Sequence, residues 1–523
     1  MEGLYTQSKQ EARVLRVQLP ICDTTVTNEV SGEVSLPDYQ PEIKRLLRVS
    51  ATVQPPSHYV GGGAMEFSGT VDYCIFYTGN DGRMYCFPTS QDYSVRVPLE
   101  AGADFDLSDA LVCYAHSEPE AIISRVSGPR RMSVKCRLRS RVKAYGSCVI
   151  EEKRQGTADD GEERLLHEAT STVSSYTLGT PFVLSDEILL ERDGEEEGGE
   201  YRIISGDARA LISEASCAAG RVNCRGELIL KLLLARDGKD EIPMTVWRKI
   251  PIDHIVPLEG AEEGGAATVT GHCTELDLSM EDGRVVCEAE VVLEVCARRD
   301  RTLTYTSDLY AIGRESSTEM KHYRLPRALR CVNGNMTQSE SLSSEELGLN
   351  GDGRVVDVHG TAQIEDVSID RGRYVVNGKC RYTLIVACDG EMLAKELERP
   401  FRYTADAAPD ESTPLGWEGE ADVVSARAVL DGERAAIDAE IGIRLCFMSE
   451  DEIAVVSSMS VGESIERPTG RMLLCYPSPD DTLWSIGKRY HASTDALAES
   501  NHLPTAPRAD APASLGDGGV VVI

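Results

Sequence analysis

A pattern of about 150 residues occurs three times along this chain of 523 residues, and it restricts the possible folds more than any other feature. Its clearest marker is a glycine that opens a run of mostly apolar residues, found at Gly69, Gly226 and Gly378. Each run leads into an Asp-Gly pair, a dipeptide typical of tight hairpin turns, at 81–82, 237–238 and 389–390. Three copies of one folding unit are therefore predicted.

Two further landmarks recur at the same interval as the glycine. An upstream segment begins near residues 49, 205 and 358, and a downstream segment begins at Arg131, Arg284 and Arg434. Apolar and polar residues alternate within these segments, which is the two-residue period of a β-strand. We therefore predict a mainly β fold in which each copy is a β-sandwich-like unit.

Acidic and glycine-rich stretches mark the expected boundaries between the units, because such stretches are typical of loops. They lie at 151–163, 314–319 and 466–471. The predicted domains are three β repeats followed by a small α/β module, at 1–155, 165–315, 316–467 and 472–523.

The charge balance argues against two classes of partner. The chain has 86 Asp and Glu against 54 Lys and Arg, a net charge of -32. Nucleic acid and anionic membrane surfaces would repel such a chain, although solubility alone also accounts for the acidity. We expect neither nucleic-acid binding nor direct membrane insertion, since no long apolar segment or targeting segment is visible.

No residue pattern predicts catalysis, a metal site or a cofactor. The nine histidines are dispersed, and the sixteen cysteines occur without a Cys-x-x-Cys pair. Zinc and thiol-redox motifs require His or Cys pairs at short, fixed spacings such as Cys-x-x-Cys, which this sequence lacks. The expectation is a protein that is not an enzyme, with buried free thiols in a reducing compartment.

The last fifty residues follow a different pattern. Asp481 or Thr482 can cap a helix, and Leu483, Ile486 and Tyr490 then form one apolar face. A second short helix would end at 501, and residues 520–523 form a β-branched terminal run. This order predicts a βααβ module in which the last run pairs with the strand before the first helix.

The run from Asp480 to Ile486, DDTLWSI, followed by Tyr490, resembles the signature of the LysM domain. That resemblance implies a binding module. In such modules N-acetylglucosamine lies in a shallow groove between two loops. The equivalent residues here are Asp480, Asp481, Thr482, Leu483, Asn501, His502 and Leu503. Asp480 stands where the family has glycine, and a longer loop with Pro504, Pro507 and Pro512 borders the groove; both departures favour a protein ligand over a sugar.

A protein-binding role for the module would use the first helix. The candidate contact residues are Trp484, Ile486, Lys488 and Arg489, because tryptophan is enriched at the centres of protein interfaces. Two alternatives remain open at this stage. Trp484 is either a packed side chain of the module or an exposed anchor, and the two cations are either a solvated face or docking charges for an acidic surface.

The first copy contains LPDYQPEI at residues 36–43, which resembles the LPD-x-x-P-x-I pattern of SPOCS domains from endospore-forming bacteria. SPOCS repeats with one C-terminal LysM domain resemble the SipL-like family of spore morphogenetic proteins. The resemblance implies a non-enzymatic scaffold of spore coat and cortex assembly in the mother-cell cytoplasm at the forespore surface. Its LysM module would dock a SpoIVA-like coat ATPase, with other coat proteins as further candidate partners. The alternatives are peptidoglycan binding and a structural subunit of spore coat or surface fibres.

Overall fold

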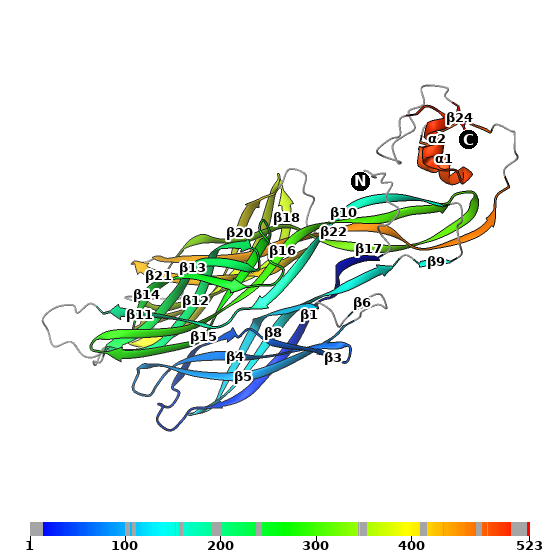
Figure 1. Cartoon of the computed structure of the whole chain (residues 1–523). Helices are drawn as coiled ribbons and strands as arrows, with labels where there is room; N and C mark the ends of the chain where they lie inside the picture. The colour runs from blue at the N-terminus through cyan, green and yellow to red at the C-terminus, as the bar shows by residue number, and fades with distance from the viewer. Residues whose placement is uncertain are drawn as a thin grey trace.

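The computed structural model describes residues 14–99, 105–106, 111–151, 153–155, 161–190, 201–236, 243–343, 345, 353–407, 416–431, 434–466, 473–478, 480–503 and 520–523. Long antiparallel strands form an elongated body, and two short helices lie together at one end of it (Figure 1). The prediction of a mainly β chain that ends in a small α/β module is confirmed.

The first copy is a sandwich of two sheets that share one apolar core. One sheet contains β1 (Val14–Ser35), β8 (Arg131–Glu151), β7 (Val112–Gly128) and the short β6 (Phe105–Asp106). The other contains β2 (Arg45–Val53), β4 (Ala64–Thr78), β5 (Met84–Pro98) and the short β3 (Ser57–Gly61).

The second copy repeats this arrangement with a divided first strand. Its first group contains β10 (Glu162–Leu178), β11 (Phe182–Leu189), β16 (Arg284–Ala311) and β15 (Ala266–Glu281). Its second group contains β12 (Tyr201–Ala218), β13 (Arg221–Arg236) and β14 (Met244–Pro257). A single pairing between Ala210 and Gly271 joins the groups into one sheet.

The third copy again has two sheets around a common core. The first contains β17 (Arg314–Ser343), β22 (Arg434–Ser464) and β21 (Gly416–Asp431), with β9 (Lys153–Gln155) added in parallel to β22. The second contains β18 (Arg354–Asp370), β19 (Arg373–Cys388) and β20 (Glu391–Asp406). In every copy the first strand pairs with the last, the last pairs with the long strand before it, and the three long strands between them pair in order.

The marker glycines occupy one equivalent place in this topology, on the middle strands β4, β13 and β19. Gly378 lies opposite Phe401, and a β-carbon added there would come 2.4 Å from that ring. At Gly226 an added β-carbon would come 2.0 Å from the carbonyl oxygen of Leu211. The repeated glycine therefore reflects close approach of a neighbouring strand or ring, for which only glycine leaves room.

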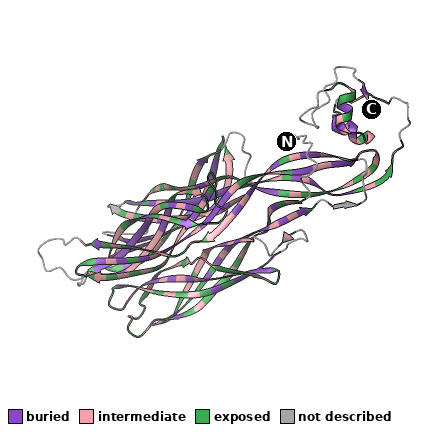
Figure 2. Ribbon diagram, viewed as in Figure 1, coloured by how far each residue is buried: buried purple, intermediate pink, exposed green. Residues whose placement is uncertain are grey.

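The three copies pack against one another around a shared core and do not form separate domains along the chain. The second strand of each copy carries a β-bulge, at which one extra residue is inserted. The inserted residues are Leu47, Ile204 and Val356, and all three are buried in a single apolar cluster. Figure 2 shows buried positions along strands throughout the body.

A second shared core lies where the first and last strands of the copies extend beyond the sandwiches. It combines Val17 and Ile150 of copy one, Tyr305 of copy two, and Leu325 and Val455 of copy three. The extended strands continue toward the C-terminal module (Figure 1). This core supports the end of the body on which the module sits.

Buried charges also join the copies. Asp357 forms ion pairs with Arg48 at 2.6 Å and with Lys231 at 3.1 Å, and all three residues are buried. Burial alone would raise the pKa of Asp357, but Lys231 and Arg48 hold it well below its usual value. Asp357 of copy three therefore stays ionised and joins its copy to Arg48 of copy one and Lys231 of copy two.

The segment LPDYQPEI forms a fixed turn after β1. Leu36 and Ile43 are buried in the core of copy one, whereas Tyr39 is exposed. Arg130 holds the turn by donating to the carbonyl oxygens of Pro37, at 2.8 Å, and of Gln40. These contacts give the turn a structural role. The domain boundaries and the relation to SPOCS domains stay predictions.

Candidate functional site

The C-terminal module consists of β23 (Leu474–Cys475), α1 (Leu483–Tyr490), α2 (Thr494–Ser500) and β24 (Val521–Val522). β23 and β24 pair antiparallel, as predicted for the terminal run. Leu483, Ile486, Leu497 and Val521 fill its small core. The module thus has an apolar core of its own that is independent of the body.

Thr482 begins α1 through a reciprocal cap. Its hydroxyl accepts from the backbone N–H of Ser485 at 3.0 Å, and the Ser485 hydroxyl accepts from the N–H of Thr482 at 3.0 Å. This capping box satisfies two amide groups that the first helical turn leaves free. Of the two caps that the sequence allowed, Thr482 is the one used.

Asp481 is a structural residue of the same loop. Its carboxylate accepts from the N–H of Ser478 at 2.9 Å and from the hydroxyl of Ser485 at 3.0 Å, and it pairs with Arg489 at 2.6 Å. The hydrogen bond from Arg489 is the largest of the effects that lower the pKa of Asp481. Arg489, which was a candidate partner contact, is therefore half exposed and engaged inside the module.

Asn501 fastens the last strand. Its amide nitrogen donates to the carbonyl oxygens of Leu497 and Val522, both at 2.8 Å, and its amide oxygen accepts from the N–H of Val522 at 2.7 Å. Of the groove equivalents, Asn501 and Thr482 thus hold the module together. Leu483 is buried, and Leu503 packs against the same core.

The exposed members of the predicted groove are Asp480 and His502. Tyr476, which was not singled out in the sequence, precedes this loop and is 75% exposed. The prolines of the bordering loop, Pro504, Pro507 and Pro512, lie outside the described residues. A ligand at this edge would therefore meet backbone together with the side chains of Asp480 and His502.

Trp484 is buried against the β body. Its indole lies edge-on to the ring of Tyr310, with centroids 5.0 Å apart, and Leu165 completes the cluster. The indole Nε1 donates to Asp308 at 2.8 Å, and 5% of the residue remains exposed. The structure thus places Trp484 in a packed position, between the module and copy two.

Further polar contacts surround this cluster, and we call the whole interface the dock. Lys488 Nζ contacts both carboxylate oxygens of Asp308, at 2.6 and 2.8 Å. The hydroxyl of Tyr310 donates to the carbonyl oxygen of Ala492 at 2.7 Å. The N–H of Gly313 donates to the carbonyl oxygen of His491 at 2.8 Å. These contacts join α1 and the turn after it to the end of β16.

Glu163 of β10, the strand that pairs with the end of β16, adds another contact. It accepts from the N–H and the hydroxyl of Thr494, each at 3.2 Å. Among the four candidate partner contacts, Trp484 and Lys488 therefore bind the chain's own body and Ile486 is fully buried in the module. The dock leaves Asp480 and His502 exposed.

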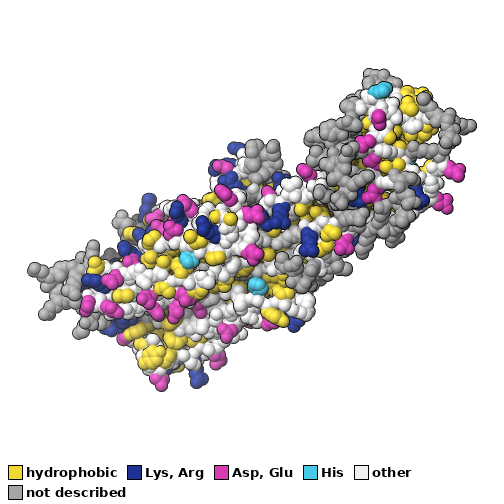
Figure 3. Space-filling model, viewed as in Figure 1, with side chains coloured by type: hydrophobic (Ala, Val, Ile, Leu, Met, Phe, Trp, Pro, Cys, Tyr) yellow, Lys and Arg dark blue, Asp and Glu magenta, His cyan; other side chains and the backbone are white. Residues whose placement is uncertain are grey.

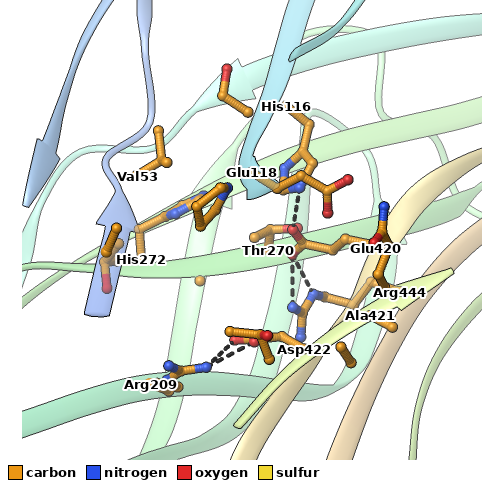
Figure 4. A pocket seen from close by; sticks show the side chains of 18 of the residues that line it. Val53, His116, Glu118, Arg209, Thr270, His272, Glu420, Ala421, Asp422 and Arg444 are labelled. Carbon is orange, nitrogen blue, oxygen red and sulfur yellow. Dashed lines mark hydrogen bonds and ion pairs between the residues drawn. The ribbon is translucent and has the colours of Figure 1, made fainter. Parts of the chain in front are cut away.

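A polar cavity of about 220 Å³ lies where the three copies meet (Figure 4). Charged side chains line it in neutralised pairs. His116 contacts Glu420 at 2.8 Å, Arg444 contacts the same carboxylate, and Arg209 contacts Asp422 at 2.8 Å. Burial alone would lower the pKa of His116, but Glu420 raises it to about 9. The pairing of these charges with one another indicates a structural role.

Acidic and basic side chains are interspersed on the face of the body shown in Figure 3. Among the described residues, no group of three His, Cys, Asp or Glu side chains is placed to hold a metal ion. Neither described helix is long and apolar enough to cross a membrane.

Comparison with known families finds a LysM domain at residues 478–506. The match contains Thr482, Trp484 and Asn501, and it supports a role in binding carbohydrate of the peptidoglycan type. No curated protein and no solved structure matches the chain.

Proposed function

We propose that this protein is a non-enzymatic scaffold that binds an N-acetylglucosamine-containing glycan, such as peptidoglycan, through the exposed edge of its LysM domain. The observation that carries the proposal is the dock. It uses the Trp484 and Lys488 side of the module and leaves Asp480 and His502 accessible. The β body would then hold the binding edge in a fixed orientation.

The chemistry of this edge is suited to modest affinity. A shallow groove recognises an N-acetyl group by backbone N–H and C=O groups, so any side chain that keeps the sugar away from the backbone weakens binding. Asp480 adds both bulk and charge at such a place. Several modules or several chains on one glycan would raise the overall affinity by effective concentration.

Titration of chitooligosaccharide into the full-length chain, together with cosedimentation with purified peptidoglycan, tests this proposal. Asp480→Gly should strengthen binding, and Asp480→Trp should abolish it by filling the groove. Glu365→Gln, an exposed change on the body, is the matched control. Failure of the unmodified chain to bind either glycan, or binding that is unchanged by Asp480→Trp, would refute the proposal.

A second candidate is a spore-envelope scaffold that docks a SpoIVA-like coat ATPase in the mother-cell cytoplasm at the forespore surface. The observation that favours it is an exposed apolar strip at β23 of the LysM domain. Leu473, Leu474 and Tyr476 are 50%, 48% and 75% exposed. This strip offers an apolar surface to a partner protein.

A pull-down of the ATPase by the full-length chain distinguishes this candidate. Tyr476→Ala should reduce capture, and Asp480→Trp should leave it unchanged if the strip and not the groove is used. Capture that is insensitive to Tyr476→Ala, or absent altogether, would count against the coat-ATPase role.

A further inference from the structure

Two cysteines face one another across the longest strand pair of copy three. Cys331 of β17 and Cys446 of β22 are direct partners in the antiparallel register. Their sulfur atoms are 2.9 Å apart. Directly opposite residues in antiparallel strands have Cα atoms about 4.5–5.5 Å apart, which lies within the span that a disulfide can bridge. The backbone therefore need not move far for the two sulfur atoms to bond.

The two thiols have different surroundings. Cys446 is fully buried, whereas Cys331 is half-buried and its sulfur lies 3.9 Å from Nη1 of Arg298. The hydrogen bond from Cys446, assisted by Arg298, lowers the pKa of Cys331 to about 7 although burial opposes the change. Burial and the adjacent Cys331 raise the pKa of Cys446. These opposite directions favour a thiolate on Cys331 beside a protonated thiol on Cys446.

We propose that Cys331 and Cys446 are a peroxide-sensitive modification site that forms a disulfide between β17 and β22. The Cys331 thiolate attacks one oxygen of hydrogen peroxide, the O–O bond breaks, and hydroxide leaves and takes up a proton to become water. The Cys446 sulfur then attacks the resulting sulfenic acid. The S–O bond breaks, and the second water leaves with the Cys446 proton. Peroxide gains two electrons and the thiol pair loses two.

The position gives this bond a structural effect. Cys331 and Cys446 are 115 residues apart, and the strands β18 to β21 lie between them in the chain. A disulfide would therefore close a loop that contains most of copy three. The bond would lie beside Arg298, which also pairs with the buried Glu418. Closing so long a loop restricts the unfolded chain, so oxidation should raise the midpoint of thermal unfolding.

The chain contains a matched control pair. The sulfur atoms of Cys74 and Cys86 are 2.7 Å apart, but the two residues are offset along β4 and β5 and are not direct partners. The hydrogen bond with Cys74 and burial raise the pKa of Cys86 well above its usual value. Proximity alone predicts that both pairs oxidise, whereas the proposal predicts that Cys331 reacts first.

The decisive experiment exposes the fully reduced, full-length protein to a small molar excess of hydrogen peroxide. Free thiols are then alkylated, and unreduced peptides are analysed by mass spectrometry. A lowered pKa raises the thiolate fraction of Cys331 at neutral pH, and the thiolate is the form that attacks peroxide. Cys331 should therefore lose its free thiol before Cys86, whose pKa is raised.

The rate should also rise between pH 6 and pH 8 as Cys331 ionises. The groups that surround Cys331 are Cys446 of β22, Arg298 and Cys296 of β16, Glu418 of β21 and Cys217 of β12. In a Cys446→Ala variant, dimedone should trap a sulfenic acid on Cys331. Cys74→Ser should leave the formation of the Cys331–Cys446 bond unchanged.

Three results would overturn the proposal. The first is a chain whose Cys331 and Cys446 stay reduced while other thiols oxidise. The second is earlier bonding of Cys74 to Cys86, and the third is bonding of Cys331 to Cys296 or Cys217. The first two comparisons use the unmodified protein, so they hold even if a substituted variant fails to fold.

Discussion

Removal of the Asp308 carboxylate should release the LysM domain from the β body. Asp308 accepts the indole N–H of Trp484 and pairs with Lys488, so Asp308→Ala removes both contacts. A hydrogen bond to a charged group contributes about 1.5–3 kcal/mol, and a half-exposed ion pair adds at most about 1 kcal/mol. A loss of about 2–3 kcal/mol would raise the population of the undocked state about 30- to 150-fold.

Native-state hydrogen exchange measures this change directly. The N–H of Gly313 donates to the carbonyl oxygen of His491 across the dock, so its exchange rate reports undocking. Asp308→Ala should accelerate exchange there by that factor and leave the amides at the centre of β19 unaffected. Arg489→Ala is the matched control, because Arg489 lies on the same helix but contacts Asp481 inside the module.

Two results would refute the reasoning about the dock. One is unchanged exchange at Gly313 in Asp308→Ala, which would mean that the remaining contacts, such as those of Trp484 with Tyr310 and of Thr494 with Glu163, hold the module without Asp308. The other is equal acceleration in Arg489→Ala, which would mean that the module unfolds and does not undock.

Three further outcomes can be measured by denaturant unfolding and exchange. Asp357→Ala leaves two buried cations unpaired and should destabilise the body by about 3–5 kcal/mol; an unchanged urea midpoint would contradict this. The raised pKa of His116 means that its pairing with Glu420 stabilises fully below about pH 6.5 and is lost as pH rises through about 9. His116→Asn should remove that alkaline decline, which amounts to at most about 3 kcal/mol, and a decline that persists in the variant would exclude His116 as its source. Asn501→Ala should release β24, seen as faster exchange of the Val522 amide by about 10- to 100-fold; protection equal to that of the parent chain would contradict the role of Asn501.

Local pattern was sufficient to predict the strands and the module. Alternation and the repeated glycine predicted the mainly β fold, because both reflect contacts between neighbouring strands. The inserted residues Leu47, Ile204 and Val356 could not be identified, since a bulge is defined by the register of two strands and not by one sequence.

In the candidate site, too, features set by local sequence were predictable and those set by distant contacts were not. The place before an apolar helix face restricted the cap to Asp481 or Thr482, and the structure shows that Thr482 is used. The burial of Trp484 did not follow from local sequence, because its partner Asp308 lies 176 residues earlier in the chain. The assignment of Asn501 to a glycan groove rested on family position alone. Its hydrogen bonds to Val522 depend on where the last strand returns, which local sequence does not specify.

The buried Asp357 has a consequence for how the copies recognise one another. The residue after the bulge is Arg48 in copy one, Ser205 in copy two and Asp357 in copy three. Three identical units in this arrangement would bring together three guanidinium groups or three carboxylates, at a prohibitive cost in a buried site. Unlike residues at like positions therefore distinguish the units, so one unit cannot take the place of another within the body.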